Sequence, residues 1–382
     1  MGFRQFTPSE YQELKKQHNI MALVGNGFDI QVTRKYRTKF SPGYVAFYRY
    51  LQARDFDSTN LIVQQMASLK ARGLPNWSDL ENAIDILVNP SSQRYTPADS
   101  VYDATVAIQA AFSEYLELVA PPDLLARLGK DSASGALSVR SMSTFVSDLA
   151  RNPDFEKFNF PSTTKHYDLF NFLFVNFNYT PLLDDYIYLD HDQWQPRVHK
   201  WADRNFTFYP NPTGDAKGFG DQNTGWSSYL RAEVVHPHGQ QSIPRSLLFG
   251  IDAPDGFHPG THPNRKLMKP YWAMNGIEFG HLFAEVRLFL IFGCSLGVSD
   301  GWWWRRIVES LDQNSGDDQA QSELVIYWWS GGTSLPARNA VVDKFLDGAG
   351  IGSGDAIGQR VRERIHVVVY TDQSPPVWLA TP

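Results

Sequence analysis

The sequence predicts an α/β protein with a Rossmann-like parallel sheet and a large helical insertion. Three observations lead to this prediction. Short apolar runs typical of buried strands alternate with helical patterns along the chain. Residues 41–165 show helical spacing of apolar residues and no strand pattern. Several of the apolar runs end in turns rich in glycine, asparagine or histidine, and the carboxyl ends of parallel strands are where such sheets bind ligands.

The composition is that of a globular protein. The chain has 382 residues, of which 42% are hydrophobic and 20% are charged, so a disordered chain is excluded. We expect a single domain over residues 1–382, with the sheet formed from about residues 15–40 and 166–382. Residues 41–165 are expected to form the helical insertion, or cap.

Charge and cysteine content exclude several function classes. A net charge of −6 does not indicate a broad nucleic-acid-binding surface. The polar N-terminus has no signal-peptide core and no apolar run is long enough to cross a bilayer, so we expect a cytoplasmic protein with no membrane partner. The single cysteine, Cys294, excludes a disulfide framework and a cysteine-based zinc module.

The order of the elements follows from the apolar pattern. Helices are expected within the insertion and at about residues 300–311 and 339–346. Residues 190–224, rich in Asp, Asn, Pro and Gly, are expected to form long loops. The predicted strands are residues 20–24, 169–177, 232–236, 246–250, 287–293, 324–329 and 364–370.

The first strand ends in the turn GNGFD, residues 25–29. Glycines at this position let backbone N–H groups approach a pyrophosphate, and the next helix N-terminus adds a favourable partial charge. The third glycine of the dinucleotide fingerprint is missing, so a plain turn with Asp29 as helix cap is an equal alternative. Asn26 is expected to face the ligand or to tolerate an unusual backbone angle. If the turn binds a nucleotide, Asp29 caps the helix or touches a ribose hydroxyl.

The second strand ends in NFNYT, residues 176–180. Asn176 and Asn178 alternate with Phe177, so they share one face of the strand and Phe177 lies on the other. An asparagine at a strand end can orient a water molecule or a ribose hydroxyl because it carries both a donor and an acceptor. The alternative is that Asn178 caps the helix that follows.

The third strand-end turn contains two histidines, His236 and His238. Histidine is the usual general base near neutral pH. The alternatives are a surface turn and a pair of metal ligands. Zinc is disfavoured because the chain has no HExxH motif and no cysteine partner for these histidines.

The fourth turn is GCSLGVSD, residues 293–300, and it repeats the strand–turn–helix arrangement of the first. It is expected to be a second nucleotide-contact loop. GCSLG also fits the letter pattern of a nucleophile elbow, so Ser295 is an alternative serine nucleophile. Only His366 follows it in the chain, inside a predicted strand. Cys294 is interpreted as a small buried hydrophobe, with a reactive thiol as the alternative.

A further stretch, WSDLE at residues 77–81, places two acids at the start of a predicted helix. We expect Asp79 to cap this helix. For Glu81 two alternatives stay open, capping and reaching into the cleft.

Taken in order, GNGFD, NFNYT, HPHG and GCSLGVSD resemble the bacteriophage abortive-infection AbiH family, which is similar to the sirtuin-like NAD-binding fold; WSDLE also resembles that family. The resemblance implies that His238 and Asn178 are catalytic and that no metal is required. It also implies a nucleotide-binding set: Gly25, Asn26, Gly27, Phe28, Asp29, Asn176, Gly239, Gly293, Ser295 and Leu296.

The function expected from this resemblance is cleavage of NAD, as a substrate, into nicotinamide and ADP-ribose. Sirtuin deacetylases resemble one another in carrying a four-cysteine zinc module, which this chain cannot build, so protein deacylation is disfavoured. A homo-oligomer and a phage-derived trigger or partner defence protein are also expected. Two alternatives remain: a non-catalytic nucleotide-binding sensor, and a serine hydrolase that uses Ser295.

Overall fold

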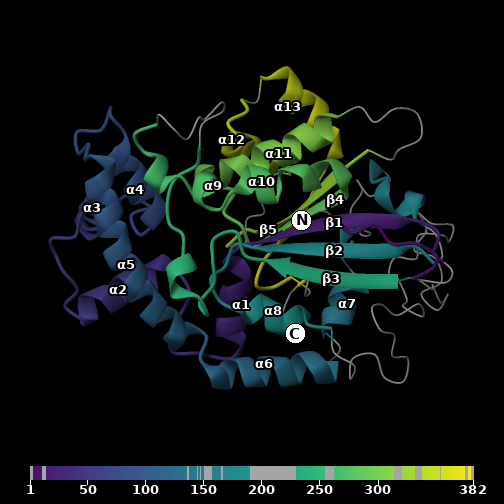
Figure 1. Ribbon diagram of the computed structural model, residues 1–382, viewed down its shortest axis with the longest axis horizontal. Helices are drawn as coiled ribbons and strands as arrows, with labels where there is room; N and C mark the ends of the chain where they lie inside the picture. Colours follow the sequence, from purple (N-terminus) through teal and green to yellow (C-terminus); the bar gives the residue numbers. More distant parts are fainter. Residues whose placement is uncertain are drawn as a thin grey trace.

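In the residues that it describes, a computed structural model of the chain contains one sheet of six strands with helices on both faces (Figure 1). The loops predicted at residues 190–224 lie outside the described residues. The structure describes residues 3–10, 14–135, 137–143, 145–146, 148–149, 157–164, 167–189, 229–253, 262–313, 321–331, 338–352, 354–374 and 377–379.

The strands lie in the order β3-β2-β1-β4-β5-β6, and every neighbouring pair is parallel. This is the order of doubly wound nucleotide-binding sheets, so the predicted Rossmann-like α/β class is confirmed. The direction in which strands are added reverses between β1 and β4. The strands are β1 (Gln17–Val24), β2 (Leu169–Asn176), β3 (Tyr229–Val235), β4 (Val286–Phe292), β5 (Glu323–Trp329) and β6 (Ile365–Tyr370).

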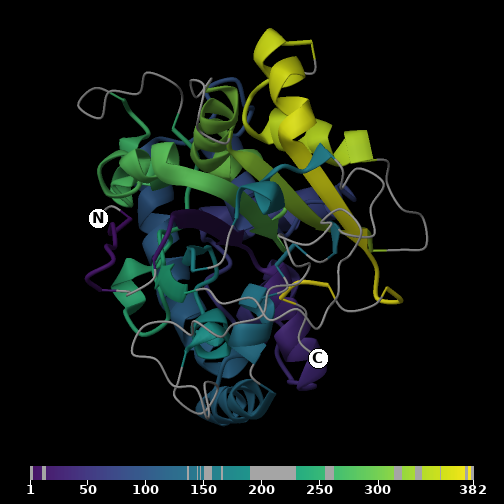
Figure 2. The same cartoon turned by 90° about the vertical axis from the view of Figure 1, so that its right-hand side faces the viewer.

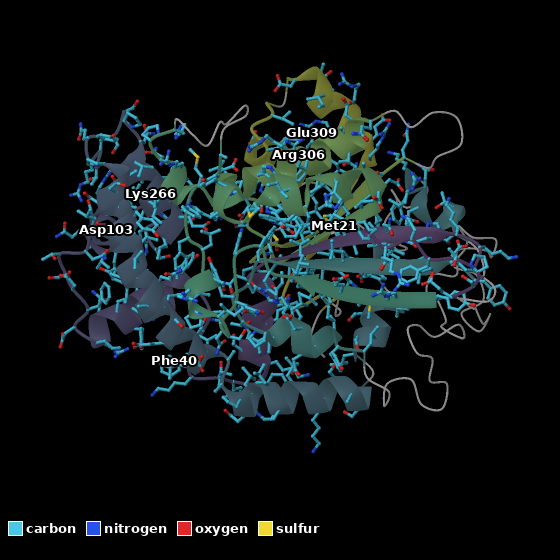
Figure 3. All side chains as sticks on the ribbon, viewed as in Figure 1. Met21, Phe40, Asp103, Lys266, Arg306 and Glu309 are labelled. Atoms are coloured by element: carbon cyan, nitrogen blue, oxygen red, sulfur yellow. The ribbon has the colours of Figure 1, made fainter. Side chains whose placement is uncertain are left out.

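The central strand β1 is buried on both faces, which explains its uninterrupted apolar run. Ile20 and Val24 belong to a core on the side of α1 and α8. Met21 and Leu23 face the opposite side and pack in a second core with α11 and α12 (Figure 3). The sheet is therefore the middle layer of three.

Helices cover both faces of the sheet, and the two layers are seen from a second direction in Figure 2. One layer contains α1 (Gly27–Lys35), α6 (Pro122–Gly135), α7 (Leu137–Ser143) and α8 (Leu182–Ile187). The other contains α9 (Lys269–Trp272), α10 (Asn275–Glu278), α11 (Gly301–Asp312), α12 (Arg338–Gly348) and α13 (Ala356–Val361).

Four helices form a separate group beyond the carboxyl ends of the strands (Figure 1). This group, the helical cap, consists of α2 (Tyr44–Ala53), α3 (Leu61–Ala71), α4 (Leu80–Val88) and α5 (Ala98–Val119). The cap has its own apolar core, whereas α6 and α7 pack in the core beneath the sheet. The helices predicted within residues 41–165 thus pack in two different cores, that of the cap and that beneath the sheet. Among the described residues, no helix combines the length and apolar character needed to cross a membrane.

One predicted strand, residues 246–250, is wrong. Leu247 and Phe249 turn toward the core of the helical cap instead of joining the sheet. The N–H of Leu248 donates to the carbonyl of His238, 2.9 Å away, so this segment runs alongside the turn after β3. The apolar pattern of a strand and that of an extended segment packed on helices are the same, which is why the sequence could not separate them.

We predict that Met21→Ala lowers the free energy of unfolding by about 3 kcal/mol, because the side chain is fully buried between β1 and the helices of the second core. Denaturant unfolding measures this loss. Met274→Ala, at a residue that is 48% exposed, is the matched control and is expected to change little. Equal unfolding midpoints for the two variants would contradict this packing.

Candidate functional site

A cavity of about 1210 Å³ lies at the carboxyl ends of the strands, between the sheet and the helical cap. Its wall includes residues from the turns after β1, β2, β3 and β4, among them Gly25, Asn178, His238 and Ser295. The cap contributes Tyr44 and other residues to the opposite wall. The volume exceeds that of an ordinary small-molecule pocket, so a ligand of dinucleotide size has room.

The cavity brings together most of the residues selected from the sequence. Four strand-end motifs that are far apart in the chain meet at one place, as expected for parallel strands. The selected residues that line the cavity are Gly25, Asn26, Gly27, Asp29, Asn178, His238, Gly293 and Ser295.

The remaining four selected residues are buried or in tight turns behind the wall. Phe28 and Leu296 pack in the two cores of the sheet. Asn176 is fully buried and its side-chain oxygen accepts a hydrogen bond from the N–H of Asn178. Gly239 has φ +85°, and a Cβ there would lie 2.0 Å from the carbonyl oxygen of Ser246. These residues support the wall from behind.

The glycines of the first turn are required by a close backbone contact with the turn after β4. A Cβ on Gly27 would lie 2.5 Å from the Cα of Gly293, and one on Gly25 would lie 2.7 Å from its carbonyl oxygen. The N–H of Gly27 donates to Gly293 and the N–H of Gly25 donates to Phe292, both at 2.9 Å. These two N–H groups are therefore engaged within the protein, and the glycines serve the approach of two turns.

Asn26 has ordinary helical backbone angles, φ −60° and ψ −16°, so the expectation of an unusual angle is wrong. It is the N-cap residue of α1, but its side chain makes no cap hydrogen bond. Its amide nitrogen instead donates to the carbonyl of Pro42, 3.3 Å away. Asn26 thus ties the first turn to the segment that leads into the helical cap.

Asp29 does not cap α1. Its Oδ2 accepts a 2.6 Å hydrogen bond from the hydroxyl of Thr180, which joins the turn after β1 to the turn after β2. Its Oδ1 is buried and has no hydrogen-bond partner among the described residues. Burial raises the pKa of Asp29 to about 7, although the Thr180 hydrogen bond acts in the opposite direction.

Asn178 is held by the turn after β1 and by the last residue of β2, the strand that it follows. Its side-chain nitrogen donates to the carbonyl of Gly25, 3.2 Å away, while its own N–H is bound by Asn176. The N-cap residue of α8 is Pro181, so the alternative in which Asn178 caps this helix is wrong. The amide is thereby fixed in a wall of the cavity.

The two histidines of the third turn have different environments. His236 lies 2.9 Å from Asp184 through its Nε2, away from the cavity wall. His238 lines the cavity, stacks on the ring of Phe177 with a centroid distance of 4.9 Å, and places Nε2 3.4 Å from Asp300 Oδ1. Burial lowers the pKa of His238 to about 3, with the nearby Lys269 acting in the same direction. The imidazole is therefore neutral at pH 7, and its lowered pKa makes it a weak base.

A buried lysine connects the helical cap to the sheet. Lys269 Nζ lies 2.8 Å from Glu81 Oε1 on α4 and 2.7 Å from Asp300 Oδ1 before α11, and its side chain is only 2% exposed. Glu81 and Asp300 line the cavity, and Asp300 also faces His238. We call Glu81, Lys269 and Asp300 the charge triad.

The members of the charge triad shift one another's pKa values. Burial alone would lower the pKa of Lys269, but the two carboxylates more than offset this and raise it, so the ammonium is charged. Burial opposes ionisation of Asp300, yet Lys269 and His238 hold its pKa below the usual range. Burial, with Asp300 adding to it, raises the pKa of Glu81 to about 7 despite the opposing effect of Lys269.

Sequence reasoning found only part of this triad. Asp79 caps α4 as predicted, since its Oδ1 accepts from the N–H groups of Glu81 and Asn82. Glu81 does reach the cavity, which settles the open alternative. Lys269 was missed because it stands in a stretch without any motif and meets Glu81 across 188 positions of the chain. Only the tertiary fold shows this contact.

The two alternative nucleophiles, Ser295 and Cys294, are not placed as the sequence alternatives suggested. Ser295 lines the cavity, but His366 lies near the amino end of β6, where it pairs with Glu323 at 3.3 Å. Since Ser295 follows the carboxyl end of β4, these two groups lie at opposite ends of the sheet. Burial raises the pKa of Cys294 well above its ordinary value, so its thiol stays protonated. Within the described part of the chain, no three His, Cys, Asp or Glu residues gather as a metal site would require.

Among known proteins, the chain matches one family model. The family model described as Bacteriophage abortive infection AbiH matches residues 21–317. No curated protein and no solved structure matches the chain.

We predict that Gly27→Ala destabilises the protein by about 1–3 kcal/mol, because the added methyl group would overlap the backbone of Gly293. Thermal or denaturant unfolding provides the measurement. Gly276→Ala is the matched control, since a Cβ there meets no atom within 4 Å. A stable Gly27→Ala protein would show that the two turns are not in contact.

Asp29 makes stability depend on pH. Because its pKa is raised in the folded state, its stabilising effect is complete below its ordinary pKa of 3.8 and is lost as the pH rises toward about 7. Asp29→Asn keeps an acceptor for Thr180 but cannot ionise. We predict that the variant gains stability relative to the natural protein between pH 5 and pH 8, by up to about 4 kcal/mol. Parallel curves of unfolding free energy against pH would contradict the raised pKa.

Proposed function

Because the chain belongs to the AbiH family of bacteriophage abortive infection, we propose that it acts in this defence by cleaving NAD into nicotinamide and ADP-ribose. Family membership supports the role in abortive infection. The observation that carries the chemical proposal is the placement of a neutral histidine, His238, and a fixed asparagine, Asn178, in one strand-end cavity of dinucleotide size.

The reaction breaks the bond between the pyridinium nitrogen and C1′ of the ribose. The bonding electron pair goes to the nitrogen, so nicotinamide leaves as a neutral molecule and needs no acid. Positive charge then develops on the sugar, and a water oxygen forms the new bond to C1′. As the water oxygen bonds to the cationic sugar carbon, the water becomes strongly acidic, so even the weakly basic nitrogen of the His238 ring accepts its proton. The carboxamide of Asn178 orients the water.

Phosphate recognition is proposed away from the two glycine N–H groups, because these are bound to the turn after β4. Among the described residues that line the cavity, Arg34 is the one arginine or lysine. It lies beside Asp372, with 58% of its side chain exposed, at the outer part of the wall. The pyrophosphate is therefore proposed to lie toward Arg34, and the nicotinamide ribose toward Asn178 and His238.

We predict that the purified protein releases nicotinamide from NAD and that His238→Ala lowers the rate at least about 100-fold, the usual contribution of a general base. Chromatographic measurement of free nicotinamide provides the test, with NAD binding followed by calorimetry. His281→Ala, at an exposed histidine outside the cavity, is the control and should retain the rate.

Binding of NAD without release of nicotinamide would contradict the catalytic proposal and support a nucleotide-binding sensor. Equal rates for His238→Ala and the unchanged protein would exclude His238 as the base. Since a defence protein is expected to rest inactive until triggered, the assay includes the protein isolated from phage-infected cells.

A further inference from the structure

The charge triad has the geometry of a recognition element facing the cavity. Glu81 comes from the helical cap, Asp300 from the sheet side, and Lys269 binds one oxygen of each at 2.8 and 2.7 Å. The lysine is almost completely buried, while the side chains of Glu81 and Asp300 keep 13% and 17% of their surface exposed. The cation is therefore behind the wall and the two carboxylates form its surface.

Each carboxylate has a second oxygen that no described protein group occupies. Lys269 binds Glu81 through Oε1 and Asp300 through Oδ1. Glu81 Oε2 and Asp300 Oδ2 make no hydrogen bond among the described residues, and neither is among the polar atoms sealed from solvent. Because both residues line the cavity, these two oxygens are accessible to a ligand.

The charges at this wall do not cancel. Above a pH of about 7, Glu81 and Asp300 carry two negative charges against the single positive charge of Lys269, and His238 is neutral. Asp252, also in the wall, is matched by Arg305 at 2.7 Å and adds little. The surplus negative charge lies in a partly desolvated place, where electrostatic interactions are stronger than in water.

We propose that Glu81 and Asp300 are specificity-determining residues that select the cationic oxidised nicotinamide ring over the neutral reduced ring. This inference rests on the proposed use of NAD. The oxidised and reduced dinucleotides have nearly the same size and the same phosphates, but only the oxidised ring carries a positive charge. A wall with surplus negative charge binds that ring more tightly, and the position of Asp300 beside His238 puts the ring at the reacting end.

Calorimetric titration with the oxidised and reduced dinucleotides at pH 8 tests this inference. All measurements use full-length protein with His238→Ala, so that NAD is not consumed. We expect this protein to bind the oxidised form about tenfold more tightly than the reduced form, which is a difference of about 1.4 kcal/mol. Glu81→Gln keeps the acceptor for Lys269 and removes one charge, and it should reduce the preference to about twofold or less.

Glu117→Gln is the matched control, because this residue is exposed on α5 and lies outside the cavity wall. It should keep the full preference. Asp300→Asn provides a second test if Glu81→Gln does not fold, and it should lower the preference in the same way. Equal affinities for the two dinucleotides, no binding of either, or an unchanged preference in these variants would overturn the inference. A clear preference without any nicotinamide release by the natural protein would instead contradict only the proposed function.

Discussion

The contact between the turns after β1 and β4 is the constraint on which the site depends. Gly25 and Gly27 approach Gly293 so closely that no side chain fits between them. In a doubly wound sheet this is the place where the strand order reverses and where a crevice usually opens. Here the two turns close over that place through two backbone hydrogen bonds. The cavity is consequently displaced outward, between the strand ends and the helical cap.

This displacement explains why the cap contributes to the chemistry of the site. Because the N–H groups of Gly25 and Gly27 are bound by the turn after β4, the polar side chains of the wall come from α1, from later strand ends and from α4. The charge triad joins the last two of these sources, since Lys269 connects Glu81 on the cap to Asp300 on the sheet side. Removing Lys269 would leave two carboxylates without a compensating charge, so the lysine also ties the cap to the sheet.

The sequence was sufficient where the information is local. The apolar run before Gly25 predicted a buried strand, and alternation across Phe177 predicted that its ring and the two asparagines point to different sides. Parallel strands end at one edge, so the meeting of Asn178 and His238 at one cavity also followed from local patterns. The role of Gly25 and Gly27 could not be predicted from local patterns, because a turn that binds phosphate and a turn that packs on another backbone both require glycine.

The features that the sequence did not predict depend on contacts between residues far apart in the chain, which leave no local sequence pattern. Lys269 acquires its role only when a short helix brings it between α4 and the turn before α11. Asp29 resembled a helix cap in the sequence, but Thr180 binds it from a strand end 151 positions away. The segment 246–250 has a strand-like pattern and packs on the cap instead, since burial against helices also requires apolar side chains.

We propose that the cavity between the strand ends and the helical cap binds NAD with its nicotinamide end at His238 and Asp300. A crystal structure of the His238→Ala protein with bound NAD tests this most directly. We expect density for the nicotinamide ribose beside Asn178, for the ring near the free oxygens of Glu81 and Asp300, and for the pyrophosphate toward Arg34. An empty cavity at saturating NAD, or a dinucleotide bound with its adenine at the charge triad, would contradict it.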